Sequence, residues 1–224
     1  MLRSEKSGLC YLDKYYGEYN NILVERKESI IFQLDKNQNV GNGWIGGNAP
    51  AYFDDKSDLF SEIGSDYHFY LCFVSPLDKN NMVSIFIPKE YENRVSKNIY
   101  PNCSLYVFEH PVSKESLDST FTEFGIVKHY ISEGIFVSEE QAFETPFFIK
   151  FGGNPFHIQE EEYYYKELEK DSYSFLCQID EDGYPSGLFH SGTSLPFGFG
   201  AVYLYAIVTE DSIKNPIVGY WQYS

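Results

Sequence analysis

The stretch FGGNPFHIQ, residues 151–159, decides the fold, because the chain writes a close variant of it, WIGGNAPAYF, at residues 44–53. Both stretches read Gly-Gly-Asn, then Pro, then an aromatic residue, and only Ala49 interrupts the match. When the two prolines are aligned, Leu71-Cys72 falls on Leu176-Cys177. Agreement of motif, spacing and following segment indicates an internal duplication with a period near 105 residues, which suits two fused half-domains.

Runs rich in Val, Ile, Tyr and Phe follow each motif in the same order. Such runs, bounded by Gly, Pro, Asn and Asp, are typical of β-strands. We expect an opening strand at 28–34 and a further strand between the two copies at 124–131. The remaining predicted strands are 67–74, 82–88 and 104–110 in the first copy, and 173–180, 201–208 and 218–224 in the second.

Helix signals are few. Ser138 and Gln141 form a capping-box pattern, which predicts a short helix before Pro146. The segments 89–97 and 159–170 are two more candidates. The sequence therefore predicts an α+β protein, mostly antiparallel sheet with few short helices. We expect a single domain in which two similar halves, about 28–110 and 124–224, pack side by side.

The composition excludes several classes of protein. The 224 residues are enough for a continuous core without disulfide or metal staples. A net charge of -16 repels nucleic acid and anionic membranes and attracts basic proteins. No apolar run has the length of a signal peptide or a membrane span, so we expect a cytoplasmic protein. The scattered cysteines match no metal or redox spacing; they are Cys10, Cys72, Cys103 and Cys177.

No motif assigns a catalytic, cofactor-binding or metal-binding residue. The glycine turns lack the spacing of a phosphate loop or a dinucleotide fingerprint. The histidines lack zinc-site spacing, Ser191 is not in a GxSxG elbow, and Cys177 is expected inside a buried strand. One catalytic alternative is a hydrolase that pairs His157 or His190 with Asp180 or Asp182.

Acidic residues beside tyrosines follow both glycine turns and suggest a protein-binding surface. Aromatic anchors supply buried area while charge steers a basic partner, although a charge run can also simply face water. The alternative is a small-ligand or carbohydrate module in which Trp44, Tyr52, Phe156 and His157 converge on one pocket. The predicted partner-binding residues are Trp44, Tyr52, Asp54, Asp55, His157, Gln159, Glu160, Glu161, Glu162, Tyr163 and Tyr164.

Three segments together resemble the YwqG-like proteins of bacteria. They are Gly-Gly-x-Pro-Phe-x-x-Gln at 152–159, Phe-Leu-x-Gln-Ile-Asp at 175–180, and a glycine-rich turn at 197–200 that leads into an aromatic strand. The likeness covers most of the chain from about residue 40. This sequence departs from the family where relatives carry an aromatic-Gly-Asp before the last strand pair, and where Asp-Pro-Arg follows the Gln.

The resemblance to YwqG-like proteins implies a duplicated, sheet-rich fold. Relatives are associated with bacterial toxin neighbourhoods, so the resemblance also implies a non-enzymatic immunity protein that covers a basic toxin domain. Such a role fits the acidic charge of the chain.

Overall fold

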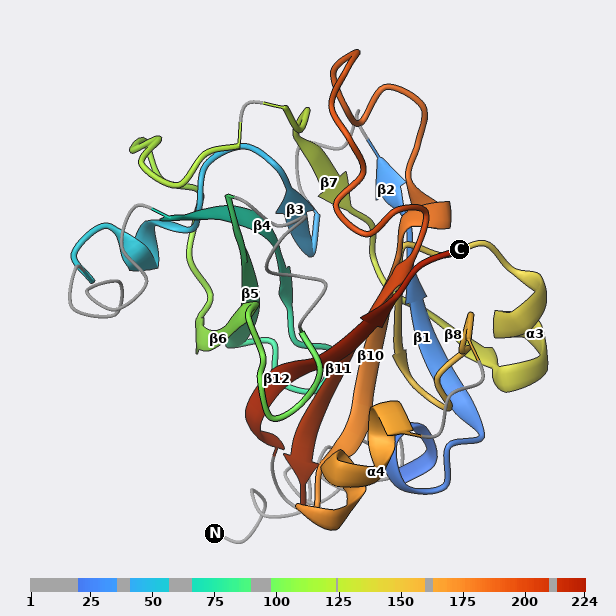
Figure 1. Cartoon of the computed structure of the whole chain (residues 1–224). Helices are drawn as coiled ribbons and strands as arrows, with labels where there is room; N and C mark the ends of the chain where they lie inside the picture. The colour runs from blue at the N-terminus through green and yellow to red at the C-terminus, as the bar shows by residue number, and fades with distance from the viewer. Residues whose placement is uncertain are drawn as a thin grey trace, which may run out of the picture.

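Two antiparallel sheets of six strands each form the body of the protein (Figure 1). The computed structural model describes residues 20–35, 41–56, 66–89, 98–123, 125–159, 163–209 and 213–224. The first sheet has the strand order β2-β7-β3-β4-β5-β6, and the second has the order β12-β11-β10-β9-β1-β8. Helices are few and short within these residues, which confirms the predicted α+β class.

The strands of the first sheet are β2 (Leu34–Asp35), β3 (Gly43–Ile45), β4 (Tyr67–Val74), β5 (Asn81–Pro88), β6 (Tyr106–Pro111) and β7 (His129–Ile131). Those of the second are β1 (Glu28–Phe32), β8 (Ile135–Ser138), β9 (Ile149–Gly152), β10 (Ser174–Asp180), β11 (Ala201–Val208) and β12 (Ile213–Gln222). The helices are α3 (Glu139–Glu144) and α4 (Tyr163–Lys170), with the helical turns η1 (Asn20–Val24), η2 (Ala51–Phe53) and η6 (Glu181–Gly183).

Most predicted elements are found at the predicted places. The strands at 67–74 and 201–208 have the predicted bounds. The capping box is formed, since the Ser138 hydroxyl accepts the Gln141 N–H and the Gln141 side chain accepts the Ser138 N–H.

Several predicted elements differ from the structure or fall partly outside it. The opening strand expected at 28–34 is divided into β1 and β2, which lie in different sheets. The strand expected at 124–131 is shorter, spanning only His129–Ile131. The helix expected at 159–170 is described from Tyr163, and the one expected at 89–97 lies almost wholly outside the described residues. No helix in the described ranges is long and apolar enough to span a bilayer.

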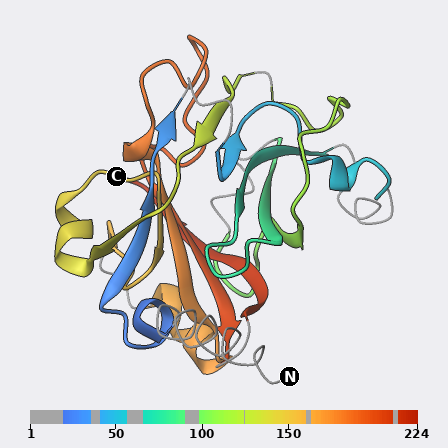
Figure 2. The same ribbon diagram turned by 180° about the vertical axis from the view of Figure 1, so that it is seen from behind.

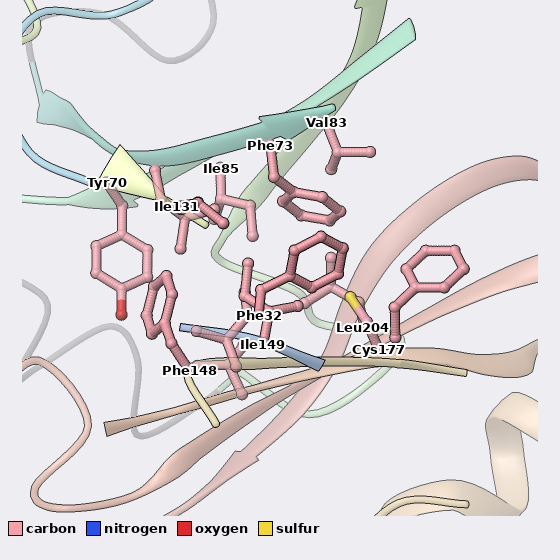
Figure 3. Close-up of a cluster of buried hydrophobic side chains, with 14 of the residues drawn as sticks. Phe32, Tyr70, Phe73, Val83, Ile85, Ile131, Phe148, Ile149, Cys177 and Leu204 are labelled. Atoms are coloured by element: carbon pink, nitrogen blue, oxygen red, sulfur yellow. The ribbon is translucent and has the colours of Figure 1, made fainter. Parts of the chain in front are cut away.

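The main core lies between the two sheets. Side chains alternate between the two faces of a strand, so each sheet turns one set of apolar residues toward the other sheet. Figure 3 shows Phe73, Val83 and Ile85 of the first sheet meeting Phe32 and Ile149 of the second. Smaller clusters cover the outer faces; they include Trp44, Phe53, Phe69 and Cys72 on the first sheet, and Phe175, Tyr203, Tyr205 and Tyr220 on the second.

The two halves repeat one strand arrangement. In each, a meander of four antiparallel strands follows the same order, β3 to β6 in the first half and β9 to β12 in the second. The second strand of each meander carries an irregularity at the same place, between Phe69 and Leu71 and between Phe175 and Cys177. Shared order and a shared bulge position agree with the predicted duplication.

The alignment of Cys72 with Cys177 is wrong by one residue. Counted from the bulge, Cys177 corresponds to Leu71, and both side chains face the core between the sheets. Cys72 lies instead in the outer cluster of the first sheet. Ala49 caused the error: it is an extra residue between the glycines and the proline, so alignment at the prolines shifts the strand by one, and a one-residue shift reverses every face.

The halves lie against each other and also exchange their first strands. Strand β1 opens the first half, yet it pairs with β9 and β8 in the second sheet (Figure 1). Strand β7 opens the second half, yet it pairs with β3 and β2 in the first sheet. The ranges 28–110 and 124–224 therefore describe the repeat in sequence, while each sheet combines strands from both ranges.

Both Gly-Gly-Asn motifs form turns that need glycine. The φ angles are 66° and 71° at Gly46 and Gly47, and 75° and 62° at Gly152 and Gly153. These values lie in the left-handed region, which glycine enters without the steric cost that a Cβ imposes. The predicted tight turns are therefore present in both copies.

Matching hydrogen bonds hold the two turns. The Trp44 indole donates to the Asn48 carbonyl at 2.9 Å, and the Lys150 ammonium donates to the Asn154 carbonyl at 2.7 Å. The N–H of each asparagine donates to a glutamate carboxylate, at 2.9 Å and 2.8 Å; these glutamates are Glu115 and Glu139. The motif is repeated because the same loop is anchored in the same way at both places.

Candidate functional site

A pocket of about 410 Å³ lies on the outer face of the second sheet, beside α4 and the second glycine turn. Helix α4 and the turn η1 lie next to each other at this end of the molecule (Figure 2). Residues distant in the sequence therefore meet here. The lining includes Arg26, His157, Tyr165, Glu169, Tyr173 and Tyr205.

Arg26 is the positive group of the pocket. It precedes β1 and adopts a φ of 54°. Its guanidinium donates to the carbonyls of Gly153 and of Phe175, the latter at 3.1 Å, and lies 5.9 Å from the centre of the Phe175 ring. Burial lowers the pKa of Arg26. It forms no ion pair with any residue that the structure describes.

A connected set of rings forms one wall of the pocket. The Tyr205 and Tyr220 hydroxyls lie 3.1 Å apart, and Tyr220 is 2.7 Å from Nε2 of His157. The Tyr165 ring is stacked on the His157 ring with centroids 5.8 Å apart. Burial raises the pKa of Tyr205 to about 12 and lowers that of His157. At neutral pH the wall is therefore uncharged.

Glu169 is the negative group of the pocket and lies on the exposed side of α4. The helix is amphipathic, with Leu168 buried in the outer cluster while Glu167 and Glu169 face solvent. Arg26 lowers the pKa of Tyr205 and Glu169 raises it, so both charges are close to this hydroxyl. The pocket therefore offers one cation and one anion on an aromatic lining.

A buried ion pair holds the loop that borders the pocket. The Lys150 side chain is fully buried, and its Nζ lies 3.0 Å from a Glu139 oxygen. It also donates to the carbonyl of Asn154, a pocket residue, and lies 4.4 Å from the centre of the Phe156 ring. Burial lowers the pKa of Lys150 to about 8, against the opposing effect of Glu139. These contacts anchor the loop to the buried Lys150 side chain.

The first glycine turn does not present the predicted aromatic anchors. Trp44 is only 7% exposed and packs in the outer cluster of the first sheet, so it is not available to a partner. The Tyr52 ring is half-buried and stacks on His110 at 4.6 Å. Asp54 and Asp55 are exposed just after η2. This surface offers carboxylates but packs its rings inward.

Of the partner-binding residues predicted after the second glycine turn, one lines the pocket, two form local hydrogen bonds, and the side chains of the others lie outside the described part of the chain. His157 lines the pocket. Gln159 accepts a hydrogen bond from the Tyr164 hydroxyl at 3.0 Å and donates to the Tyr223 carbonyl, so both Gln159 and Tyr164 support the local structure. Glu160, Glu161 and Glu162 lie outside the described residues, as does the side chain of Tyr163.

The single pocket predicted for aromatics of both turns is not formed. Trp44 and Tyr52 pack on the outer face of the first sheet. Phe156 packs beside Phe147, and His157 lies against the tyrosines of the second sheet. The core between the sheets separates these two outer faces, so the four side chains cannot converge.

The predicted hydrolase pair is not assembled either. The Asp180 carboxylate accepts hydrogen bonds from the Gln178 side chain and the Asp182 N–H, each at 3.0 Å. His157 is bonded to Tyr220. Burial raises the pKa of the Cys177 thiol, as expected for a core cysteine. Within the described ranges, no three His, Cys, Asp or Glu side chains are grouped closely enough to hold a metal ion.

Several pocket residues were not among the predicted site residues. Tyr205 of the pocket could have been grouped with Tyr203, which lies outside the lining, since residues two apart share a face of a strand. This would have pointed to a tyrosine-rich outer face. No local motif marks Arg26, because its partners are more than 120 residues away in sequence. Glu169 belongs to an acidic run in the sequence, but only the structure places it in the same pocket as Arg26.

Comparison with models of known protein families gives no match, and comparison with characterised proteins gives none either. The resemblance to YwqG-like proteins stays a prediction, and the function must be argued from the geometry of the pocket and of α4.

Proposed function

We propose that this protein is a non-enzymatic binding protein whose partner is a basic protein that docks on the α4 face. The observation that carries the proposal is the placement of an aromatic pocket beside exposed carboxylates. Tyr165 and Tyr173 line the pocket, while Glu167 and Asp171 are exposed next to it. Glu167 is paired with Lys170, and Asp171 accepts a hydrogen bond from the Tyr100 hydroxyl. The net charge of -16 strengthens the attraction for a basic surface.

Charged and aromatic side chains contribute differently to a protein–protein interface. Exposed carboxylates steer a basic partner and set the association rate, while partly buried rings supply contact area at the centre. The α4 face has both features. Beside Asp54 and Asp55 the half-buried Tyr52 ring is stacked on His110, whereas beside α4 several rings line one pocket. A basic toxin domain is the class of partner that the resemblance to YwqG-like proteins implies, and the protein would then act as an immunity protein.

Capture followed by measurement with purified components tests the proposal. The immobilised chain is first exposed to native lysate at low salt. A retained basic protein is then purified, and its affinity for the chain is measured at roughly 50 and roughly 200 mM salt, because salt in this range screens attraction between exposed charges. We expect affinity to fall with salt. Absence of any complex with a basic protein at low salt would overturn the proposal.

A charge-matched pair of variants locates the docking surface. Glu167→Lys lies on α4, and Asp55→Lys makes the same type of change on the other sheet. We expect Glu167→Lys to slow association with the purified partner by roughly 10-fold, because rim charges act mainly on the association rate. Asp55→Lys should have a much smaller effect. An equal or larger effect of Asp55→Lys would place the interface elsewhere.

A further inference from the structure

A basic partner protein would not supply a counter-charge for Arg26 in the pocket. A guanidinium has five N–H donors, and the bonds to Gly153 and Phe175 use only part of them. The group is partly buried, lines the pocket and has no carboxylate partner among the described residues. Glu139 is near enough to raise the pKa of Arg26 against the larger lowering by burial, but its carboxylate is paired with Lys150. An anionic group that enters the pocket would give Arg26 a direct counter-charge and offset part of its burial cost.

The other pocket groups restrict which anion can enter. Glu169 lines the same pocket, so a ligand with only negative charge would be repelled, and a ligand with only positive charge would be repelled by Arg26. A neutral sugar would leave Arg26 without a counter-charge. A molecule that carries one carboxylate and one ammonium satisfies both groups.

The pocket lining determines which uncharged group of the ligand can lie between its two charges. Tyr165 and Tyr173 present rings on the α4 side of the pocket, and Phe175 and Tyr205 present rings on the sheet side. Aromatic linings favour apolar or aromatic ligand groups. The volume of about 410 Å³ falls in the range of small-molecule sites.

We propose that this pocket binds a small zwitterion with an apolar body, an amino acid or a short peptide. Its carboxylate pairs with Arg26, its ammonium pairs with Glu169, and its side chain packs against Tyr165 and Tyr173. The inference goes beyond the proposed function, since it depends on Arg26 and Glu169 in the pocket lining and not on Glu167 or Asp171, the carboxylates assigned to partner docking.

Isothermal titration of the full chain with four probes tests the charge requirement. The probes are L-phenylalanine, L-phenylalaninamide, N-acetyl-L-phenylalanine and the dipeptide Phe-Ala. We expect phenylalanine or the dipeptide to bind. The tighter of the two shows whether the pocket prefers a free amino acid or a short peptide. Loss of the carboxylate in the amide should weaken binding by roughly 10- to 100-fold, the value of a charge-assisted hydrogen bond. The acetylated probe should lose only about 2- to 5-fold, because Glu169 is exposed.

Variants of the chain assign each charge to its partner. Arg26→Met keeps much of the aliphatic stem and should abolish binding of the zwitterion. Glu169→Gln should weaken phenylalanine but leave the acetylated probe unchanged, since that probe has no ammonium. Glu140→Gln, at an exposed carboxylate on α3 outside the pocket lining, is the matched control and should leave both affinities unchanged.

The proposal fails under clear outcomes. Equal affinity for phenylalanine and its amide would show that Arg26 does not recognise a carboxylate. No heat and no chemical-shift change with any probe at millimolar concentration would exclude a zwitterion site. If Arg26→Met does not fold, the amide comparison and Glu169→Gln still decide the matter. Partner docking is judged separately with Glu167→Lys, so either proposal can fail alone.

Discussion

Glu181 shows how one buried carboxyl can anchor a loop. It is 4% exposed and accepts N–H groups from Phe197 at 2.9 Å and Gly200 at 3.1 Å. These bonds hold the glycine-rich segment that leads into β11. Burial raises the pKa of Glu181 to about 7, although the backbone donors oppose the shift.

The raised pKa predicts a stability that falls as pH rises. The folded state holds the Glu181 proton more tightly than the unfolded state, whose pKa is near 4.5. The free energy of unfolding should therefore decrease between pH 4.5 and about 7, by on the order of 2 kcal/mol. Urea unfolding across this range measures the slope. Glu181→Gln should flatten it, whereas the same change at the exposed Glu140 should not; an unchanged slope in Glu181→Gln would refute the assignment.

At the scale of residues, the sequence predicted which cysteines are buried better than it predicted where individual side chains lie in the sheets. It predicted buried cysteines in strands, and both Cys72 and Cys177 are buried. It gave them equivalent places, which the extra Ala49 makes wrong. It also took Trp44 as a binding residue, whereas its ring packs in a cluster that only the sheet pairing creates.

At the scale of elements, the second glycine turn depends on close packing as well as on its dihedral angles. A Cβ on Gly152 would lie 1.8 Å from Cγ2 of Ile22 in η1. Gly192 has a φ of 89°, and a Cβ there would meet nothing within 4 Å. The two positions share left-handed strain and differ in steric room.

We therefore expect Gly152→Ala to destabilise the protein more than Gly192→Ala. Left-handed strain costs about 1–2 kcal/mol for a residue with a Cβ, and overpacking adds about 1–3 kcal/mol. The difference between the two variants in denaturant midpoint, at equal m-value, isolates the packing part. Similar midpoints for both would contradict the close contact between η1 and the turn.

Elements were predicted well where the signal is local. The capping box at Ser138 and the strands at 67–74 and 201–208 depend on neighbouring residues only. The strand predicted at 124–131 was too long, because apolar residues before His129 make loop contacts instead of strand pairs. Val127, for example, donates its N–H to the Leu188 carbonyl. The pocket could not be predicted, since it joins segments near residues 26, 157, 169 and 205.

At the scale of the whole molecule, the exchanged strands tie the halves together. Strand β1 pairs on one side with β9 and on the other with β8, so the second sheet is complete only with a strand from the first half. Strand β7 plays the same part in the first sheet, between β3 and β2. The pairing pattern of sheets is a long-range property that the repeat alone did not reveal.

Separated halves should therefore not fold alone. A division after Glu123 leaves β1 to β6 in one fragment and β7 to β12 in the other. We expect each fragment to lack a cooperative thermal transition by circular dichroism, because each sheet is missing an interior strand. An equimolar mixture should recover β-structure and a cooperative transition. Two independently folded fragments would refute the intertwined arrangement.

The central functional claim is that the α4 face, and not the first glycine turn, receives the partner. Hydrogen–deuterium exchange of the chain with and without the purified basic partner tests it most directly. The account predicts slower exchange in α4 and the residues that follow it, 163–173, with little change at 46–56. Protection at 46–56 together with unchanged exchange across α4 would contradict it.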